Sequence, residues 1–224
     1  MPDNEKEFFI GIDLGVKEKR TTGICILEKV DESVFPSETW CKICRDIVGK
    51  DVFKVIGRYL KETKVIAIDA PLTRGRGKGK MRLYEKFLST KIFRKEKVNP
   101  IPPILMPNFC DFALEINPKL EKKGFALDLN LIEVFPTLIK KICNEKFFLF
   151  NCPASGENQK SASICAITAF LHANFKTRYL GYRDGFLFLP EMTFWGKSWR
   201  KKFYQAWVER DRLKYHRLIT NIFK

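Results

Sequence analysis

Three short apolar runs in this chain each end at an acidic residue. They are FFIGI before Asp13, VIAI before Asp69 and LI before Glu133. A glycine or a proline follows each acid within a few positions. Apolar runs of this length with a breaker behind them predict buried strands rather than helices. The pattern therefore predicts three strands that each carry a carboxylate near their C-terminal end.

A carboxylate at the end of a strand has an ordinary and a functional interpretation. The ordinary role of a single aspartate is a helix N-cap or a salt bridge. A desolvated carboxylate must otherwise be hydrogen-bonded or bound to a cation, because its burial is costly. Ligands of open α/β sheets bind beyond the carboxyl ends of the strands. If the three strands are parallel neighbours, Asp13, Asp69 and Glu133 converge on one site.

The rest of the pattern predicts a hairpin and several helices around these strands. Residues 21–29 are expected to form a strand antiparallel to the first, with a further strand near 39–44. This order of hairpin, helix and strand is typical of a mixed sheet in an α/β protein. The apolar segment 161–173 carries small residues that suit close packing on a sheet. Predicted helices cover 51–62, 81–93, 109–123, 138–144 and 161–173, and a last strand covers 186–190.

The composition indicates an ordinary globular protein. The chain has 224 residues, of which 45% are hydrophobic, as in a typical soluble domain. We expect the main domain to cover 1–194 and a basic, aromatic helical extension to cover 195–224. No apolar run approaches the length of a membrane span, and the polar start of the chain does not predict a signal peptide. A cytoplasmic location is the resulting expectation.

The charge predicts a polyanionic partner. Lys and Arg number 41 against 26 Asp and Glu, which gives a formal charge of +15. Such a field favours nucleic acid, although a basic surface without such a partner is the alternative. The glycine-rich loop 73–82 offers cations that could bind substrate phosphates, or could simply be solvated. They are Arg74, Arg76, Lys78, Lys80 and Arg82.

Other reactive residue types give weaker signals. Seven cysteines, an odd number, indicate reduced thiols. Cys41 and Cys44 form a C-x-x-C pair, but no second pair or histidine cluster completes a tetrahedral zinc site in the sequence. His172 is expected to be a satisfied or exposed helix residue rather than a ligand. In the extension, Trp199, Phe203 and Trp207 form a helical stripe that suits a docking face better than a base-stacking platform.

The motifs, taken in chain order, are similar to those of a known family. They are GIDLG with Asp13, IDAPL with Asp69, GKGKMRLYEK from Gly77, PIPP, EVFPT with Glu133 and CAITA from Cys165. Over most of residues 8–190 this set resembles a domain-of-unknown-function family of predicted nucleases with an RNase H-like fold, related to RuvC-like enzymes. The resemblance implies a five-stranded mixed sheet flanked by helices and a carboxylate site for divalent metal. It implies Asp13, Asp69 and Glu133 as the catalytic and metal-binding acids, and Arg82 with Glu85 match its R-x-x-D/E feature.

The chain departs from this family at one site position. The family usually begins its last core helix with an aspartate, where this chain has Ser161. A hydroxyl lacks the charge that helps to hold a second cation. Glu157, one helical turn earlier, is the candidate replacement ligand.

The function that follows is hydrolysis of nucleic acid with Mg²⁺ or Mn²⁺ held by these acids in a two-metal site. One alternative is a nucleic-acid-binding protein whose catalytic site has degenerated at Ser161. Another is a sugar kinase or actin-like ATPase, because GIDLG and the residues after it resemble that superfamily's phosphate loop. Those proteins need two such lobes, and the sequence shows no internal repeat.

Overall fold

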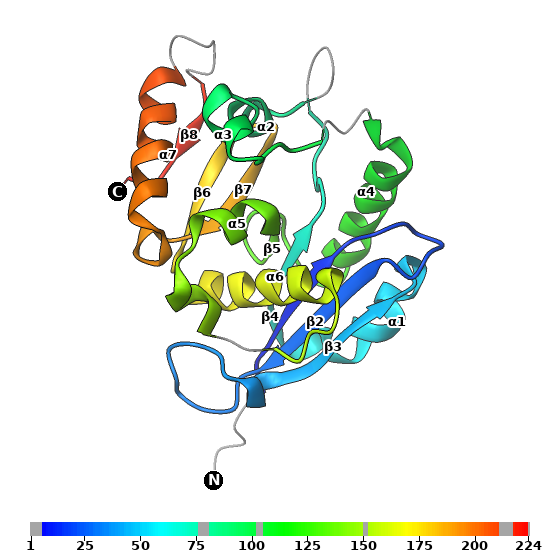
Figure 1. Ribbon diagram of the computed structural model, residues 1–224. Coiled ribbons are helices and arrows are strands. Elements are labelled where there is room, and N and C mark those ends of the chain that lie inside the picture. Colours follow the sequence, from blue (N-terminus) through cyan, green and yellow to red (C-terminus); the bar gives the residue numbers. More distant parts are fainter. Residues whose placement is uncertain (1–5, 76–80, 102–104, 150–151, 211–216, 224) are drawn as a thin grey trace.

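The computed structural model describes residues 6–75, 81–101, 105–149, 152–210 and 217–223. Within these residues the centre is a five-stranded sheet in the order β3-β2-β1-β4-β5 (Figure 1). β1 is antiparallel to β2 and parallel to β4, and β4 is parallel to β5. This mixed sheet, flanked by helices, confirms the predicted α/β fold of RNase H-like type. The strands are β1 (Phe8–Asp13), β2 (Thr22–Glu28), β3 (Cys41–Ile47), β4 (Thr63–Asp69) and β5 (Leu131–Glu133).

Helices cover both faces of the sheet. On one face α6 crosses β1, β2 and β4 (Figure 1). On the other face α1, η3 and α4 cover the isoleucines of the same strands. The α-helices are α1 (Val52–Ile56), α2 (Leu83–Leu88), α3 (Lys91–Lys95), α4 (Pro107–Glu121), α5 (Pro136–Ile142), α6 (Glu157–Ala173) and α7 (Lys197–Glu209). The 3-10 helices are η1 (Glu38–Trp40), η2 (Gly49–Asp51), η3 (Gly57–Glu62), η5 (Glu145–Leu149) and η6 (Met192–Phe194).

The contact between β1 and α6 depends on small side chains. A Cβ atom on Gly11 would lie 2.1 Å from the carbonyl oxygen of Ala162 and 2.2 Å from the amide nitrogen of Ala166. Close packing of 161–173 on the sheet is therefore confirmed. Side chains alternate along a strand, so Asp13 lies on the same side of β1 as Gly11. The first turns of α6 thus lie beside the carboxyl end of β1.

The structure divides two predicted helices: 51–62 changes from α1 to the 3-10 helix η3, and 81–93 is interrupted near Ser89. The segment 81–93 forms α2 and α3 instead of a single helix. The Glu85 side chain accepts a hydrogen bond from the Arg82 amide and starts α2. The Ser89 hydroxyl donates to the Glu85 carbonyl at the end of α2, and α3 begins at Lys91 with Thr90 as its N-cap. A hydroxyl that bonds to the backbone in this way competes with the helix hydrogen bonds, and the apolar pattern of the sequence does not show it.

The C-terminal residues pack into the same core as the sheet. Trp199 and Phe203 of α7 are buried and contact Phe93, so the aromatic stripe is a docking face. A second, three-stranded sheet has the order β7-β6-β8, of which only β7 was expected from the pattern. Its strands are β6 (Thr177–Tyr182), β7 (Gly185–Pro190) and β8 (Ile219–Thr220).

Two further expectations concern single features of the described residues. Both ring nitrogens of His172 are hydrogen-bonded, to the Thr177 hydroxyl and to the Leu129 carbonyl. His172 is therefore a satisfied structural residue, as predicted. Across the described ranges, no helix combines the length and the apolar character that a membrane crossing requires.

Candidate active site

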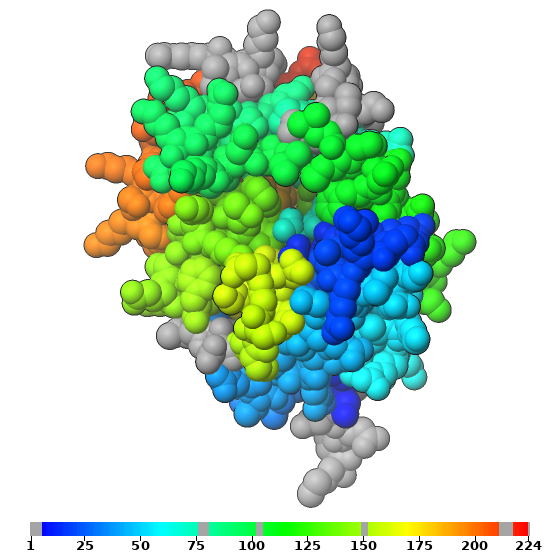
Figure 2. All heavy atoms as spheres, turned by 45° about the vertical axis from the view of Figure 1, so that its right-hand side comes forward, coloured from blue at the N-terminus to red at the C-terminus, as the bar shows by residue number. Residues whose placement is uncertain are grey.

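Asp13 and Asp69 lie side by side at the carboxyl ends of two parallel strands. They are direct register partners in the β1/β4 ladder. Both line a pocket of about 560 Å³, together with Glu133 of β5 and Asn158 of α6. Figure 2 shows the face on which the blue N-terminal segment, the green α4 and the yellow α6 come together. The convergence predicted from the strand ends is thus present.

The environment of this pair disfavours two negative charges. Burial raises the pKa of Asp13 from its ordinary value to about 7, and nearby Asp46 adds to the rise. Burial also raises the pKa of Asp69 well above its ordinary value, and the charges of Asp13 and Glu133 raise it further. Lys140 opposes both increases. Binding of a proton or an additional cation therefore stabilises the pair.

Asp13 makes the stability of the metal-free protein depend on pH. Because its folded-state pKa is about 7, the folded protein holds this proton more tightly than the unfolded chain does. That contribution is complete below about pH 4 and is lost as the pH rises through 7. We expect Asp13→Asn to stabilise the protein against urea by about 2–4 kcal/mol more at pH 8 than at pH 4.5, at about 1.4 kcal/mol per tenfold change in acidity. Equal stability differences at the two pH values, measured with a chelator present, would refute this.

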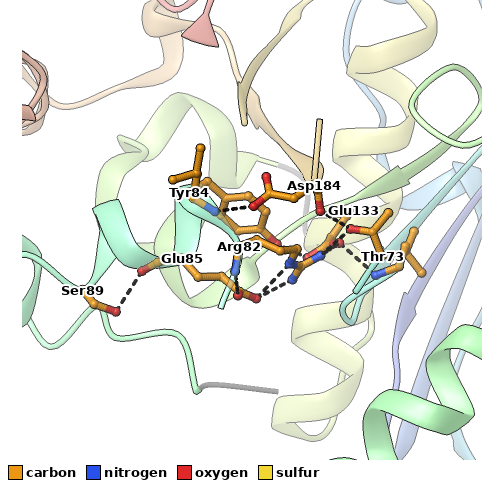
Figure 3. Close-up of polar contacts among 9 residues, drawn as sticks. Thr73, Arg82, Tyr84, Glu85, Ser89, Glu133 and Asp184 are labelled. Carbon is orange, nitrogen blue, oxygen red and sulfur yellow. Dashed lines mark hydrogen bonds and ion pairs between the residues drawn. The ribbon is translucent and has the colours of Figure 1, made fainter. Parts of the chain in front are cut away.

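Glu133 is held by a buried hydrogen-bond network (Figure 3). Arg82 binds it through two nitrogens, with Nη1 2.5 Å from Oε2 and Nη2 2.7 Å from Oε1. The Tyr84 hydroxyl donates to Oε1, and the Leu72 amide donates to Oε2 at 2.9 Å. Both carboxylate oxygens thus accept two hydrogen bonds, and the charge is paired. Glu133 sits beside the aspartates as predicted, but as the partner of an arginine.

Arg82 uses all its donors inside the protein. Its guanidinium also binds Glu85, through Nε and Nη2, and donates from Nη1 to the Thr73 hydroxyl. With the two bonds to Glu133, these contacts use all five N–H groups of an arginine. The side chain is 2% exposed. Arg82 therefore has no donor left for a substrate phosphate.

Arg74, another of the predicted substrate-binding cations, lies on the surface outside the pocket. Arg74 is exposed and pairs with Asp111 of α4 at 2.8 Å. The prediction for Arg76, Lys78 and Lys80 concerns residues outside the described ranges.

A lysine lies beside Ser161, the residue that stands where the resembled family usually has an aspartate. Lys140 of α5 donates to the Ser161 hydroxyl at 3.2 Å and pairs with Glu157 at 3.3 Å. A hydrogen bond from Ser161 lowers the pKa of Asp13, after the larger effect of the Lys140 charge. Helix α6 does begin at Glu157, but that side chain is 74% exposed and also pairs with Lys160. Lys140 was missed in the sequence because a lone lysine on a helix ordinarily indicates a solvated face.

The C-x-x-C pair is not isolated, contrary to expectation. Cys25 of β2 is the register partner of Cys44 on β3, and Cys152 reaches them from the segment before α6. The sulfurs of Cys25, Cys44 and Cys152 lie within 4.8 Å of one another, close enough to hold a metal ion. Cys41 joins them, with its sulfur 3.2 Å from that of Cys152. The β2/β3 register and the return of the chain to these strands at Cys152 produce this cluster. Neither can be read from the sequence.

Comparisons with known proteins find sequence similarity over a short segment only. No family model matches the chain, and no solved structure matches it. Two curated relatives, both described as nucleotide-binding proteins of Staphylococcus epidermidis, are 40% identical over 45 residues. That segment is 20% of this chain, and the chain spans 15% of each relative's length.

Proposed function

We propose that this protein is a metal-dependent nuclease that hydrolyses phosphodiester bonds at Asp13 and Asp69. The observation that carries the proposal is the pairing of these two desolvated carboxylates in one pocket, at the carboxyl ends of parallel strands. Ligand sites of open α/β sheets lie at such ends. The formal charge of +15 favours a nucleic-acid substrate. The short likeness to nucleotide-binding proteins is consistent with a phosphate-bearing ligand.

The donor set fits one hard divalent cation rather than two. Asp13 and Asp69 offer carboxylate oxygens, which suit Mg²⁺ or Mn²⁺. Glu133 does not fit as a ligand while Arg82, Tyr84 and Leu72 occupy its oxygens. Ser161 brings no charge, and Lys140 already donates to its hydroxyl. When bound, the cation would acidify water and stabilise charge on the phosphate.

The surrounding residues would tune this site. Protons compete with the cation for Asp13, because its pKa in the metal-free protein is about 7, so metal affinity falls in acid. Lys140 supplies a fixed positive charge beside both aspartates. We assign it the compensating role that a second cation has in a two-metal site. The Arg82 network keeps Glu133 paired and in place at the pocket wall.

The second candidate function is nucleic-acid binding without cleavage. Two observations favour it: Glu133 is neutralised by Arg82, and Lys140 stands beside Ser161. The kinase alternative receives less support, because the described residues contain one lobe of this kind, built on one five-stranded sheet.

The test is a cleavage screen of the wild-type protein. End-labelled single-stranded, double-stranded and branched DNA and RNA are incubated with Mg²⁺ or Mn²⁺, and with a chelator as the control. We expect cleavage of at least one substrate with metal and none with the chelator. Binding that weakens with salt, without cleavage under either metal, would contradict the nuclease and support the second candidate.

A further inference from the structure

Four of the seven cysteines meet at one corner of the sheet. Cys25 lies on β2, Cys41 and Cys44 lie on β3, and Cys152 lies in the segment that leads into α6. Cys25 and Cys152 are buried, and the other two are partly buried. The three remaining cysteines, Cys110, Cys143 and Cys165, belong to helices or helix ends elsewhere. The gathering thus draws thiols from three separate parts of the chain.

The sulfurs of Cys25, Cys44 and Cys152 lie within reach of one metal ion, and the sulfur of Cys41 lies next to that of Cys152. A Zn–S bond of about 2.3 Å in a regular tetrahedron places sulfurs about 3.8 Å apart. The sulfurs of Cys25 and Cys152 are 3.9 Å apart, and those of Cys41 and Cys152 are 3.2 Å apart. Cys25, Cys44 and Cys152 are mutually within 4.8 Å. The two-residue spacer between Cys41 and Cys44 is the usual one for zinc ligands.

The chemistry of the cluster favours a soft cation. Buried thiols packed singly behave as small apolar side chains, but that role does not require thiols from three segments to gather around Cys152. Thiolate ligands select Zn²⁺ over Mg²⁺ or Mn²⁺.

We propose that Cys25, Cys41, Cys44 and Cys152 bind a structural Zn²⁺ ion. Each thiol gives up its proton to solvent when it ligates the metal. Four thiolates fill the tetrahedron, so the site has no open position for catalysis. This site is separate from the aspartate pocket and does not depend on the nuclease proposal.

The ion would fasten the start of α6 to the outer strands of the sheet. Cys152 precedes α6 by a few residues, and α6 carries Asn158, which lines the aspartate pocket, and Ser161, which hydrogen-bonds to Asp13. Zinc bound to β2, β3 and this segment would therefore fix the helix whose first turns line the pocket. Loss of the ion is expected to reduce stability and to loosen that end of α6.

The test is metal analysis of the full-length protein. Reduced wild-type protein, after addition of Zn²⁺ and removal of the unbound metal, is expected to retain about one zinc ion per chain. Titration with Co²⁺ is expected to give the visible absorption of tetrahedral cobalt thiolate. Cys41→Ser and Cys152→Ser should each lose the stoichiometric zinc and this absorption. Cys143→Ala, which removes a thiol outside the cluster, should keep both.

Two results would overturn the proposal. One is wild-type protein that retains no zinc and shows no cobalt thiolate absorption, which needs no variant to interpret. The other is a Cys41–Cys152 disulfide found by mass spectrometry in protein purified without reductant, together with seven freely reacting thiols after reduction in the presence of Zn²⁺.

Discussion

Arg82→Met is expected to lower the free energy of unfolding by about 3–5 kcal/mol, because it leaves buried carboxylates without their cation. Glu85 is 3% and Glu133 5% exposed, so water cannot take over the role of the guanidinium. Methionine fills much of the same volume, which restricts the change to charge and hydrogen bonding. Urea denaturation at pH 7 measures the effect.

A surface arginine provides the matched control for this prediction. Arg74 pairs with Asp111 at 2.8 Å, and their side chains are 65% and 61% exposed. Exposed pairs contribute about 0–1 kcal/mol, so Arg74→Met should change stability by no more than that. Adding Glu133→Gln to Arg82→Met should recover part of the loss, because it removes one uncompensated charge. Equal effects of the two single arginine variants would show that the buried network does not stabilise the fold.

Asp69→Asn is expected to reduce metal-dependent cleavage by about 10³-fold or more. The cation supplies several kcal/mol of transition-state stabilisation, and about 1.4 kcal/mol corresponds to a tenfold change in rate. The fold should survive, because asparagine has nearly the same shape and removes a charge that burial disfavours. Cleavage is measured at saturating Mn²⁺ with the substrate that the wild type cuts.

The control for this variant is an acid outside the pocket. Asp111→Asn removes an exposed carboxylate on α4 and should leave the rate unchanged. If Asp69→Asn cleaves as fast as the wild type, Asp69 is not part of the catalytic site.

The sequence predicted the central strands, because burial imposes a recognisable pattern of apolar residues on a strand. The runs before Asp13 and Asp69 are apolar at every side-chain position, as strands covered on both faces require. Both runs were assigned to strands, and the predicted convergence of the two aspartates depended on these strands being parallel neighbours, as the β1/β4 pairing shows. The strands β6 and β8 were not predicted. β6 is partly exposed and β8 has only two residues, so neither leaves a clear apolar pattern in the sequence.

The partners in the site could not be predicted in this way. Arg82 and Glu133 are 51 residues apart in the chain, and the sequence offered Arg82 equally as a loop cation. The contact of Lys140 with Ser161 depends on the relative placement of α5 and α6. Likewise, Cys25 joins the C-x-x-C pair only through the β2/β3 register. Each case is a tertiary juxtaposition of residues that are individually unremarkable in the sequence.

Calorimetric titration of Mn²⁺ into the wild type and into Asp13→Asn at pH 7 tests the central claim most directly, namely that Asp13 and Asp69 together hold one divalent cation. Carboxylates rather than thiolates prefer Mn²⁺, so the difference between the two titrations isolates the pocket. We predict saturable binding of about one ion per chain in the wild type and its loss in the variant. Absence of binding in the wild type, or equal binding in both proteins, would contradict the account.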